Sequence, residues 1–307
     1  MDMNVLYNVP HEIPLTIVIA SYFYMVGLHA GCSLLSIGAT LTGKKEYKPI
    51  AKIGAIGVII LFSTAPILLI IDLGQPLRFW YLMVRGNPTS PLTWGSFFLC
   101  SYPVTTTIYI ISLFKGNMKY AKIFGAISLP LAIGVHAYTG FVLSMGISRV
   151  AWSTSLMPIY FLSSAMVSGI ALMTIIGIIR HWTRNRQESW ADTHEKEVDY
   201  GLLINLTRLA GVFMILNLFI VFTEQVNMHF ESEEAIEAAK MMLTGHLSKM
   251  YAIFDLGLGN LLPVLAMAIP GVNKNLKVWL VLMVFALIGV YIMRYTVTVG
   301  SQFLPIM

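Results

Sequence analysis

The sequence predicts an all-α integral membrane protein built as a bundle of eight transmembrane helices. Of its 307 residues, 57% are hydrophobic and only 11% are charged, whereas an average soluble domain carries about 25% charged residues. Apolar runs long enough to cross a hydrocarbon layer of about 30 Å recur along the whole chain. We therefore expect one membrane domain over residues 1–307.

The apolar runs, and the glycine, proline and charged residues between them, define the expected helices. These helices cover residues 13–42, 50–72, 93–114, 121–144, 156–180, 201–223, 246–270 and 277–300. Because the number of helices is even, both chain ends are expected on the same side of the membrane.

The basic residues indicate which side that is. Most of the 20 lysine and arginine residues stand in the odd-numbered connections, whereas the longest acidic stretch lies in the sixth connection, at 224–245. Basic loops remain in the cytoplasm, so both termini are expected on the outer, periplasmic side of a bacterial cytoplasmic membrane. The net charge of +5 is thus a topology signal, and the expected partner is the lipid bilayer rather than nucleic acid.

The cysteines and histidines indicate no metal or haem site. Cys32 and Cys100 lie inside apolar segments without a CxxC motif or a Cys/His cluster, so we expect two buried small side chains, no disulfide and no bound metal. A haem would need two histidines that face each other from different helices. Only His29 and His136 are well embedded, and nothing in the sequence marks them as a pair.

Ionisable residues inside membrane spans are costly to bury and are therefore candidates for function. Asp72 ends the second expected helix and is followed by a Gly/Pro turn and Arg78. This acid could exchange protons at a partly dry site, or it could pair with Arg78 for structure. Asp255 and Arg294 fall at similar depth in the last two helices, and we expect a salt bridge between them.

Tyr138 lies about one and a half turns from the outer end of the fourth helix, between Gly134 and Gly140. The glycines would leave room for a flat ring, and a phenol can donate a hydrogen bond to a quinone carbonyl. A tyrosine of the interfacial aromatic belt is the alternative.

On the first helix, Tyr22 and His29 share a face. His29 could carry protons toward the midplane, or serve as a hydrogen-bonded structural histidine.

Several motifs resemble the NrfD/polysulfide-reductase membrane-subunit family. They are spread over nearly the whole chain: Tyr22 to Gly31, Asp72-Leu73-Gly74-Gln75-Pro76-Leu77-Arg78-Phe79-Trp80, Asn87-Pro88-Thr89-Ser90-Pro91-Leu92-Thr93-Trp94-Gly95, Trp152 to Pro158, Phe161 to Ala165, and Arg294 to Gln302. The combination of Asp-Leu-Gly with Pro-Thr-Ser-Pro-x-x-Trp-Gly is the most specific of them.

The resemblance implies a haem-free, eight-helix subunit that exchanges electrons between a membrane quinone, menaquinone or ubiquinone, and a ferredoxin-like iron–sulfur subunit docked on the outer face. The iron–sulfur clusters belong to that partner, and a catalytic subunit, a molybdopterin enzyme or a multihaem cytochrome, completes the complex. The resemblance also assigns a quinone contact to Tyr138. Tyr22 stands where the polysulfide-reductase relative has a quinone-contacting histidine, and Gln75 stands where the family carries arginine, so Arg78 is expected to compensate.

Together these inferences predict the quinone-binding membrane subunit of a respiratory oxidoreductase, with no terminal catalytic site of its own. The quinone-binding side chains would be those of Tyr138, Tyr22 and Arg78. The proton-exchanging side chains would be those of Asp72, His29 and His136. The redox reaction could be coupled to proton translocation. The alternatives are a subunit that moves protons or ions without a quinone site, and a purely structural anchor for an external enzyme.

Overall fold

The protein is a bundle of long helices in the computed structural model, which describes residues 15–61, 64–72, 76–78, 80–84, 86–146, 149–185, 199–245 and 247–303. The α-helices are α1 (Ile17–Thr42), α2 (Lys48–Leu61), α3 (Thr64–Asp72), α4 (Tyr81–Val84), α5 (Pro91–Phe114), α6 (Met118–Ser144), α7 (Met157–Asn185), α8 (Tyr200–Glu231), α9 (Glu233–Leu243), α10 (Leu262–Ala268) and α11 (Leu276–Thr298). A π-helix, η3 (Lys249–Leu261), precedes α10, and the shorter η1 (Lys45–Tyr47), η2 (Pro76–Arg78), η4 (Val272–Lys274) and η5 (Gly300–Phe303) are 3-10 helices.

The eight expected membrane spans are confirmed, because eight helical stretches within the described residues are long and apolar enough to cross a bilayer. Six of them are single helices or a helix with a short extension. The second span consists of α2 and α3, on either side of residues 62–63, which lie outside the described part of the chain. The seventh consists of η3 and α10.

The acidic stretch at 224–245, which we expected to be a loop, is largely helical. Helix α8 continues to Glu231, and α9 follows after Ser232. The Ser232 side chain caps α9 by accepting a hydrogen bond from the Ala235 backbone N–H, and two glutamates occupy the first turn, where the helix dipole favours negative charge. Glutamate and alanine are good helix formers, so this stretch continues the bundle beyond the apolar layer.

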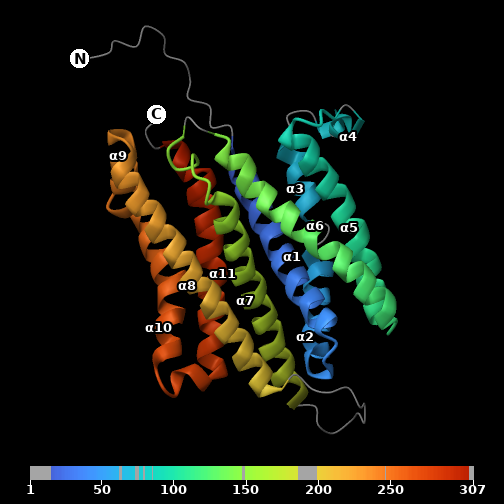
Figure 1. The fold of residues 1–307 in the computed structure, drawn as a ribbon. Coiled ribbons are helices and arrows are strands. Elements are labelled where there is room, and N and C mark those ends of the chain that lie inside the picture. The colour runs from blue at the N-terminus through green and yellow to red at the C-terminus, as the bar shows by residue number, and fades with distance from the viewer. Residues whose placement is uncertain are drawn as a thin grey trace, which may run out of the picture.

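Helices α1 and α7 lie at the centre of the bundle, between one group formed by α2, α3, α5 and α6 and another formed by α8, η3, α10 and α11 (Figure 1). At their crossing, a Cβ on Gly31 would overlap the Ala165 carbonyl oxygen and would lie 2.9 Å from Gly169 Cα. Small residues allow this approach of two backbones, which in lipid replaces the hydrophobic drive for helix association.

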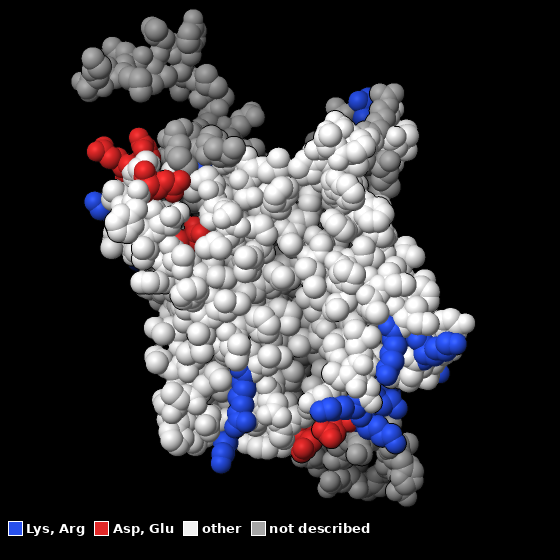
Figure 2. All heavy atoms as spheres, in the orientation of Figure 1, with Lys and Arg blue, Asp and Glu red and all other residues white. Residues whose placement is uncertain are grey.

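Charge is distributed unequally between the two ends of the bundle. Figure 2 shows most lysine and arginine side chains at the end that carries the α1–α2 and α5–α6 connections, and a group of acidic side chains over α9 at the other. Between them the surface carries large exposed hydrophobics such as Phe219 and Phe222, which are 65% and 66% exposed. An apolar belt of this kind suits contact with lipid rather than water.

The beginning and the end of the described chain are joined by one side chain. Gln302 Nε2 donates to Leu15 O at 2.8 Å and to Thr298 O at 2.9 Å, while the Leu15 N–H donates to Gln302 Oε1 at 3.3 Å. Arg149, in the segment before α7, donates to the Gln302 backbone oxygen. The start of α1 and the end of α11 are therefore fixed side by side.

The α1–α7 crossing predicts a matched pair of substitutions. Gly31→Ala should lower the free energy of unfolding by about 1–3 kcal/mol, because the new methyl group meets the α7 backbone, which cannot move aside. Gly38→Ala, on the same helix but with nothing within 4 Å of the added Cβ, should leave it unchanged or slightly higher. Thermal unfolding of the purified protein in detergent measures both. Equal stability of the two variants would contradict the assigned crossing.

Candidate functional site

The Asn-Pro-Thr-Ser-Pro-x-x-Trp-Gly motif forms the start of α5. Asn87 Oδ1 accepts hydrogen bonds from the Thr89 backbone N–H at 3.1 Å and from Thr89 Oγ1 at 2.9 Å, which makes an Asx turn. Pro91 follows at the first helical position, where a missing N–H does no harm. Trp94 Nε1 then donates back to Pro88 O at 2.9 Å. The motif thus fixes the position of its last residue, Gly95.

Gly95 is where α5 meets the ring of Tyr138 on α6. A Cβ at Gly95 would overlap the Cζ, Cε1 and Oη atoms of that ring. The Tyr138 phenol therefore packs directly against the α5 backbone at Gly95, and only glycine leaves room for it there.

The space that we expected beside Tyr138 from Gly134 and Gly140 is filled by helix packing. A Cβ at Gly134 would lie 2.9–3.1 Å from the Phe98 ring of α5, and one at Gly140 would lie 2.7 Å from Met157 O at the start of α7. That expectation was wrong, because both glycines admit neighbouring protein groups and not a free ring.

Tyr22 of α1 and Tyr138 of α6 lie near enough for their phenol groups to interact electrostatically. Tyr22 is buried, with 4% of its surface exposed. Neither hydroxyl forms a hydrogen bond with another described residue, although the Tyr22 ring packs against the ring of Phe23. Two phenol O–H groups are thus available as donors at one place.

Asp72 and Arg78 do not form the ion pair that we considered. At the end of α3, Asp72 Oδ1 accepts a hydrogen bond from Thr16 Oγ1 at 2.8 Å. Thr16 is the N-cap of α1, so the carboxylate lies near a helix N-terminus, which favours negative charge. Arg78 is exposed in η2 and forms no ion pair with a described residue. Residues 73–75, between the two, lie outside the described residues.

His29 lies on α1 against α5. Its Nδ1 is 3.1 Å from the Tyr102 hydroxyl, and the two rings meet edge to face with centroids 5.2 Å apart. His29 is about 18 Å along α1 from Ile17 at 1.5 Å per residue, near the middle of the span. The structure places it in a buried polar contact well below Tyr22, so the two residues are not in one cluster.

His136 and Arg294 form a second buried polar group where α6, α7 and α11 meet. Arg294 is fully buried, and its Nη2 donates to Phe161 O at 2.9 Å and to Ser164 Oγ at 2.8 Å, while the guanidinium lies 3.7 Å from the centre of the Phe161 ring. His136 Nε2 is 2.8 Å from the same carbonyl and 3.2 Å from Nη2. Because both Nη2 hydrogens already have acceptors, Nε2–H donates to Phe161 O, and Nδ1 remains an acceptor.

The salt bridge expected between Asp255 and Arg294 is not formed within the described part of the chain. The two groups interact electrostatically, but Arg294 bonds to α7 and Asp255 Oδ1 accepts from Asn260 Nδ2 at 3.1 Å. The physical reason is the π-helical winding of residues 249–261, which changes the direction of Asp255 from that in an α-helix.

The remaining predictions about cysteine and metal are partly corrected. Cys32 is buried in α1, but Cys100 is exposed on α5 and not buried as expected. Neither forms a disulfide. Within the described residues, no group of three or more His, Cys, Asp or Glu side chains could hold a metal ion.

The profile of the family described as "Polysulphide reductase, NrfD" matches residues 6–305. The chain belongs to the NrfD family. This confirms the resemblance drawn from the motifs, and together with the eight apolar helices it makes the chain a multi-pass integral membrane protein.

A polysulfide reductase component from Wolinella succinogenes is 29% identical to this NrfD-family chain, over 92% of the chain and 93% of that relative. A selenate reductase subunit from Mesobacillus selenatarsenatis is 28% identical over 52% of this chain and 46% of its own length. A tetrathionate reductase subunit from Salmonella typhimurium is 26% identical over 50% of this chain and 46% of its own length. All three relatives are named as one component of a reductase.

The sequence did not indicate the hydrogen-bond partners of the ionisable residues embedded in the membrane spans. Tyr102 bonds to His29, and Ser164 bonds to Arg294, yet both occur in ordinary apolar runs. The available signal was weak: Ser163 and Ser164 are adjacent hydroxyls inside an apolar helix, and such residues often bond across helix interfaces in membranes.

The Arg294 group predicts a large effect of a neutral substitution. Arg294→Met should lower the free energy of unfolding by roughly 2–3 kcal/mol, since Ser164 and the Phe161 carbonyl lose hydrogen bonds to a charged donor. Arg208→Met, at an exposed position of α8, is the matched control and should change it little. Denaturant titration in detergent measures the difference. Similar values for both variants would show that the buried group does not hold α7 to α11.

Proposed function

We propose that this NrfD-family chain is the quinone-interacting membrane subunit of a bacterial oxidoreductase complex. It lies in the cytoplasmic membrane with its acidic end and both termini on the periplasmic side, and exchanges electrons between the quinone pool and an iron–sulfur subunit. The relatives named as polysulfide, selenate and tetrathionate reductase components support a place in such a complex.

The observation that carries this proposal is the pair of phenols contributed by Tyr22 and Tyr138. A quinone carbonyl is a hydrogen-bond acceptor, and both phenol hydroxyls are donors without a partner among the described residues. The aromatic faces of the two rings also suit a flat, apolar ligand. The residues present therefore fit a quinone head group between α1 and α6, with Gly95 holding Tyr138 in position.

Proton exchange is assigned to Asp72. A quinone takes up electrons and protons together when it is reduced, so its site needs a group that binds protons. Asp72 lies at the same end of α1 as Tyr22, and only its Oδ1 is hydrogen-bonded to a described residue. His136 stands two residues before Tyr138 with its Nδ1 unpartnered among the described residues, and can assist. His29, held by Tyr102, lies further along the same helix as Tyr22.

The partners follow from the same arrangement. A ferredoxin-like iron–sulfur subunit would dock over α4 and the start of α5, next to the phenol pair, and menaquinone or ubiquinone would enter from the bilayer. The terminal reaction would belong to a further catalytic subunit, a molybdopterin enzyme or a multihaem cytochrome. Because the rate of electron transfer falls steeply with distance, the cluster must lie close to the Tyr22–Tyr138 end.

Conservative variants test the site in the assembled complex. Tyr138→Phe should reduce quinol-linked electron transfer about 10–100-fold, because one buried hydrogen bond to the reacting ring is lost. Gly95→Ala should give a similar loss by displacing the unchanged Tyr138 ring. Tyr120→Phe, which is 52% exposed at the other end of α6, is the matched control and should retain full activity.

The competing functions predict different outcomes in the same preparation. If both site variants keep full turnover and the same sensitivity to quinone analogues, the phenol pair does not bind the quinone. If, in addition, no quinone copurifies with the complex, a purely anchoring role is the better description.

A further inference from the structure

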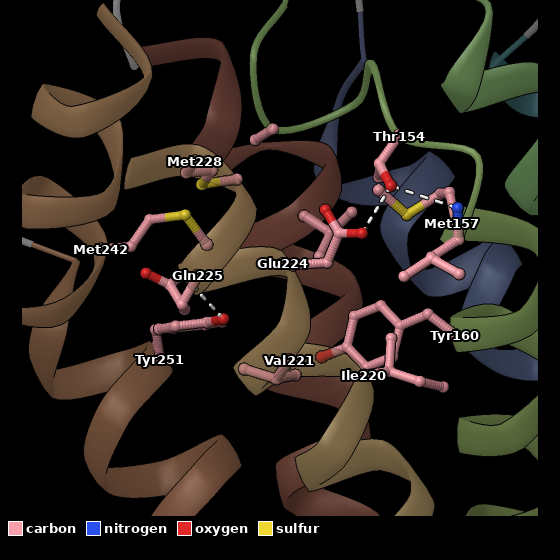
Figure 3. Close-up of a pocket in the computed structure, with 13 residues that line it drawn as sticks. Thr154, Met157, Tyr160, Ile220, Val221, Glu224, Gln225, Met228, Met242 and Tyr251 are labelled. Atoms are coloured by element: carbon pink, nitrogen blue, oxygen red, sulfur yellow. Dashed lines mark hydrogen bonds between the residues drawn. The ribbon is translucent and has the colours of Figure 1, made fainter. Parts of the chain in front are cut away.

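A pocket lies on the other side of α7 from the phenol pair, beneath α9 at the acidic end of the bundle. It has an empty volume of about 460 Å³, part of it open to the surface. Figure 3 shows Glu224 and Gln225 of α8 above it, and the rings of Tyr160 and Tyr251 entering from opposite sides. Apolar residues of α7, α8, α9 and α11 form the remaining walls.

The polar groups that line this pocket are two acceptors, the Glu224 carboxylate and the Gln225 amide oxygen, and the hydroxyl groups of Thr154, Tyr160 and Tyr251. Glu224 Oε1 accepts from Thr154 Oγ1 at 2.5 Å. Gln225 Nε2 donates to Tyr251 Oη at 3.3 Å, but Gln225 Oε1 is buried and has no partner within the described residues. Gln225 is only 8% exposed, so this acceptor cannot be satisfied by bulk solvent. A buried amide oxygen of this kind requires a donor, and water is the smallest one.

Both tyrosines interact electrostatically with the carboxyl group of Asp255, which is not among the residues that line the pocket. Asp255 is 2% exposed, and of the two tyrosines Tyr160 belongs to α7 and Tyr251 to the same helix as Asp255. The Asn260 amide donates to Oδ1, whereas Oδ2 has no hydrogen-bond partner among the described residues. The two phenol groups that line the pocket thus also interact with an acid that has one unused oxygen.

The winding of η3 places Asp255 at this depth. Residues 249–261 form a π-helix, a conformation that is rare, usually only one turn long and frequent at functional sites. Asn260 Nδ2 also donates to the Asp255 backbone oxygen at 3.0 Å, which supports the widened turn. One turn later, Gly259 meets Gly289 of α11 closely. Such a segment maintains a costly backbone geometry around a single acid.

Ionisable side chains from several helices interact electrostatically with Asp255. They are Tyr160 from α7, Tyr251 from η3 itself and Arg294 from α11, while Glu224 of α8 faces Tyr251. Arg294 Nε and Nη1 have no hydrogen-bond partner in the described residues. A cation near the carboxyl group stabilises its ionised form, and the apolar surroundings favour its neutral form. Arg294 and the apolar surroundings therefore act in opposite directions on the charge of the Asp255 carboxyl group.

We infer that this pocket is a water-filled vestibule that conducts protons from the acidic end of the bundle to Asp255, which binds them. A hydronium ion in the vestibule transfers its proton to the Tyr160 hydroxyl as that hydroxyl passes its own proton to the carboxylate of Asp255. The products are a water molecule, an unchanged phenol and a neutral carboxylic acid. This proposal does not rest on the quinone site between α1 and α6.

A second quinone is a poorer occupant for the pocket. The Tyr160 and Tyr251 hydroxyls could donate to its carbonyl groups, but a quinone has no donor for the Glu224 carboxylate or for the unpartnered Gln225 amide oxygen. Water can donate to these groups and accept from the tyrosines at once.

Protonation can be tested on the purified chain without any electron transfer. Infrared difference spectra recorded as the pH is lowered should show the carbonyl stretch of a newly protonated, buried carboxyl group. The band should be lost in Asp255→Asn and shifted in Asp255→Glu, a variant that keeps the acid if the first one fails to fold. Glu237→Gln, an exposed acid of α9, is the control and should leave it unchanged. A band that neither Asp255 variant alters would overturn the assignment.

Water access can be tested by thiol labelling in native membranes, with Cys100→Ser as the background. Val221→Cys, which faces the pocket, should react with a charged, membrane-impermeant thiol reagent. Val212→Cys lies on the same helix but is 61% exposed to the apolar belt, and should not react. Absence of labelling at residue 221, or photolabelling of Met228 and Met242 by a quinone analogue, would show that the pocket is not a water vestibule. Neither outcome depends on turnover at Tyr138.

Discussion

The fully buried guanidinium of Arg294 constrains how the central helices are arranged. A charged side chain inside a membrane span is costly by about 2.5–3.5 kcal/mol or more, unless protein groups replace water around it. Here those groups are the Phe161 carbonyl, the Ser164 hydroxyl and the face of the Phe161 ring, all from α7. Sliding α11 along α7 by one turn would separate all of them, so the arginine fixes the register of both helices. His136 of α6 bonds to the same carbonyl, which fixes a third helix.

Much of the fold could be predicted from the sequence, because lipid imposes a simple rule: each span must be long, apolar and internally hydrogen-bonded. The same rule identified His136, Asp255 and Arg294 as embedded ionisable residues. Their partners could not be predicted, since periodicity arguments assume 3.6 residues per turn. The π-helix breaks that assumption and turns Asp255 away from the expected salt bridge. Nor does the sequence tell a glycine that admits a neighbouring helix from one that admits a ligand, as Gly134 and Gly140 show.

The two proposed sites lie on opposite sides of the α1–α7 crossing, and the Arg294 group lies between them. The phenol pair belongs to α1 and α6, whereas the vestibule belongs to α7, α8, α9, η3 and α11. His136 is on the helix of Tyr138, and Arg294 interacts with Asp255. A change of charge on either side would therefore be felt electrostatically at the same guanidinium, in surroundings of low dielectric constant where such effects reach far. The Arg294 guanidinium would thus couple the proposed quinone site electrostatically to the proposed proton-binding site.

The bonds made by Gln302 have a consequence for biosynthesis. Leu15 and its partner are 287 positions apart, so the first helix is inserted long before the residue that completes it has been made. Chains emerge from the ribosome at about 5–20 residues per second, and during that time the Leu15 amide and carbonyl have to be hydrated. The nascent first helix therefore keeps its N-terminal end at the aqueous boundary until Gln302 has been made.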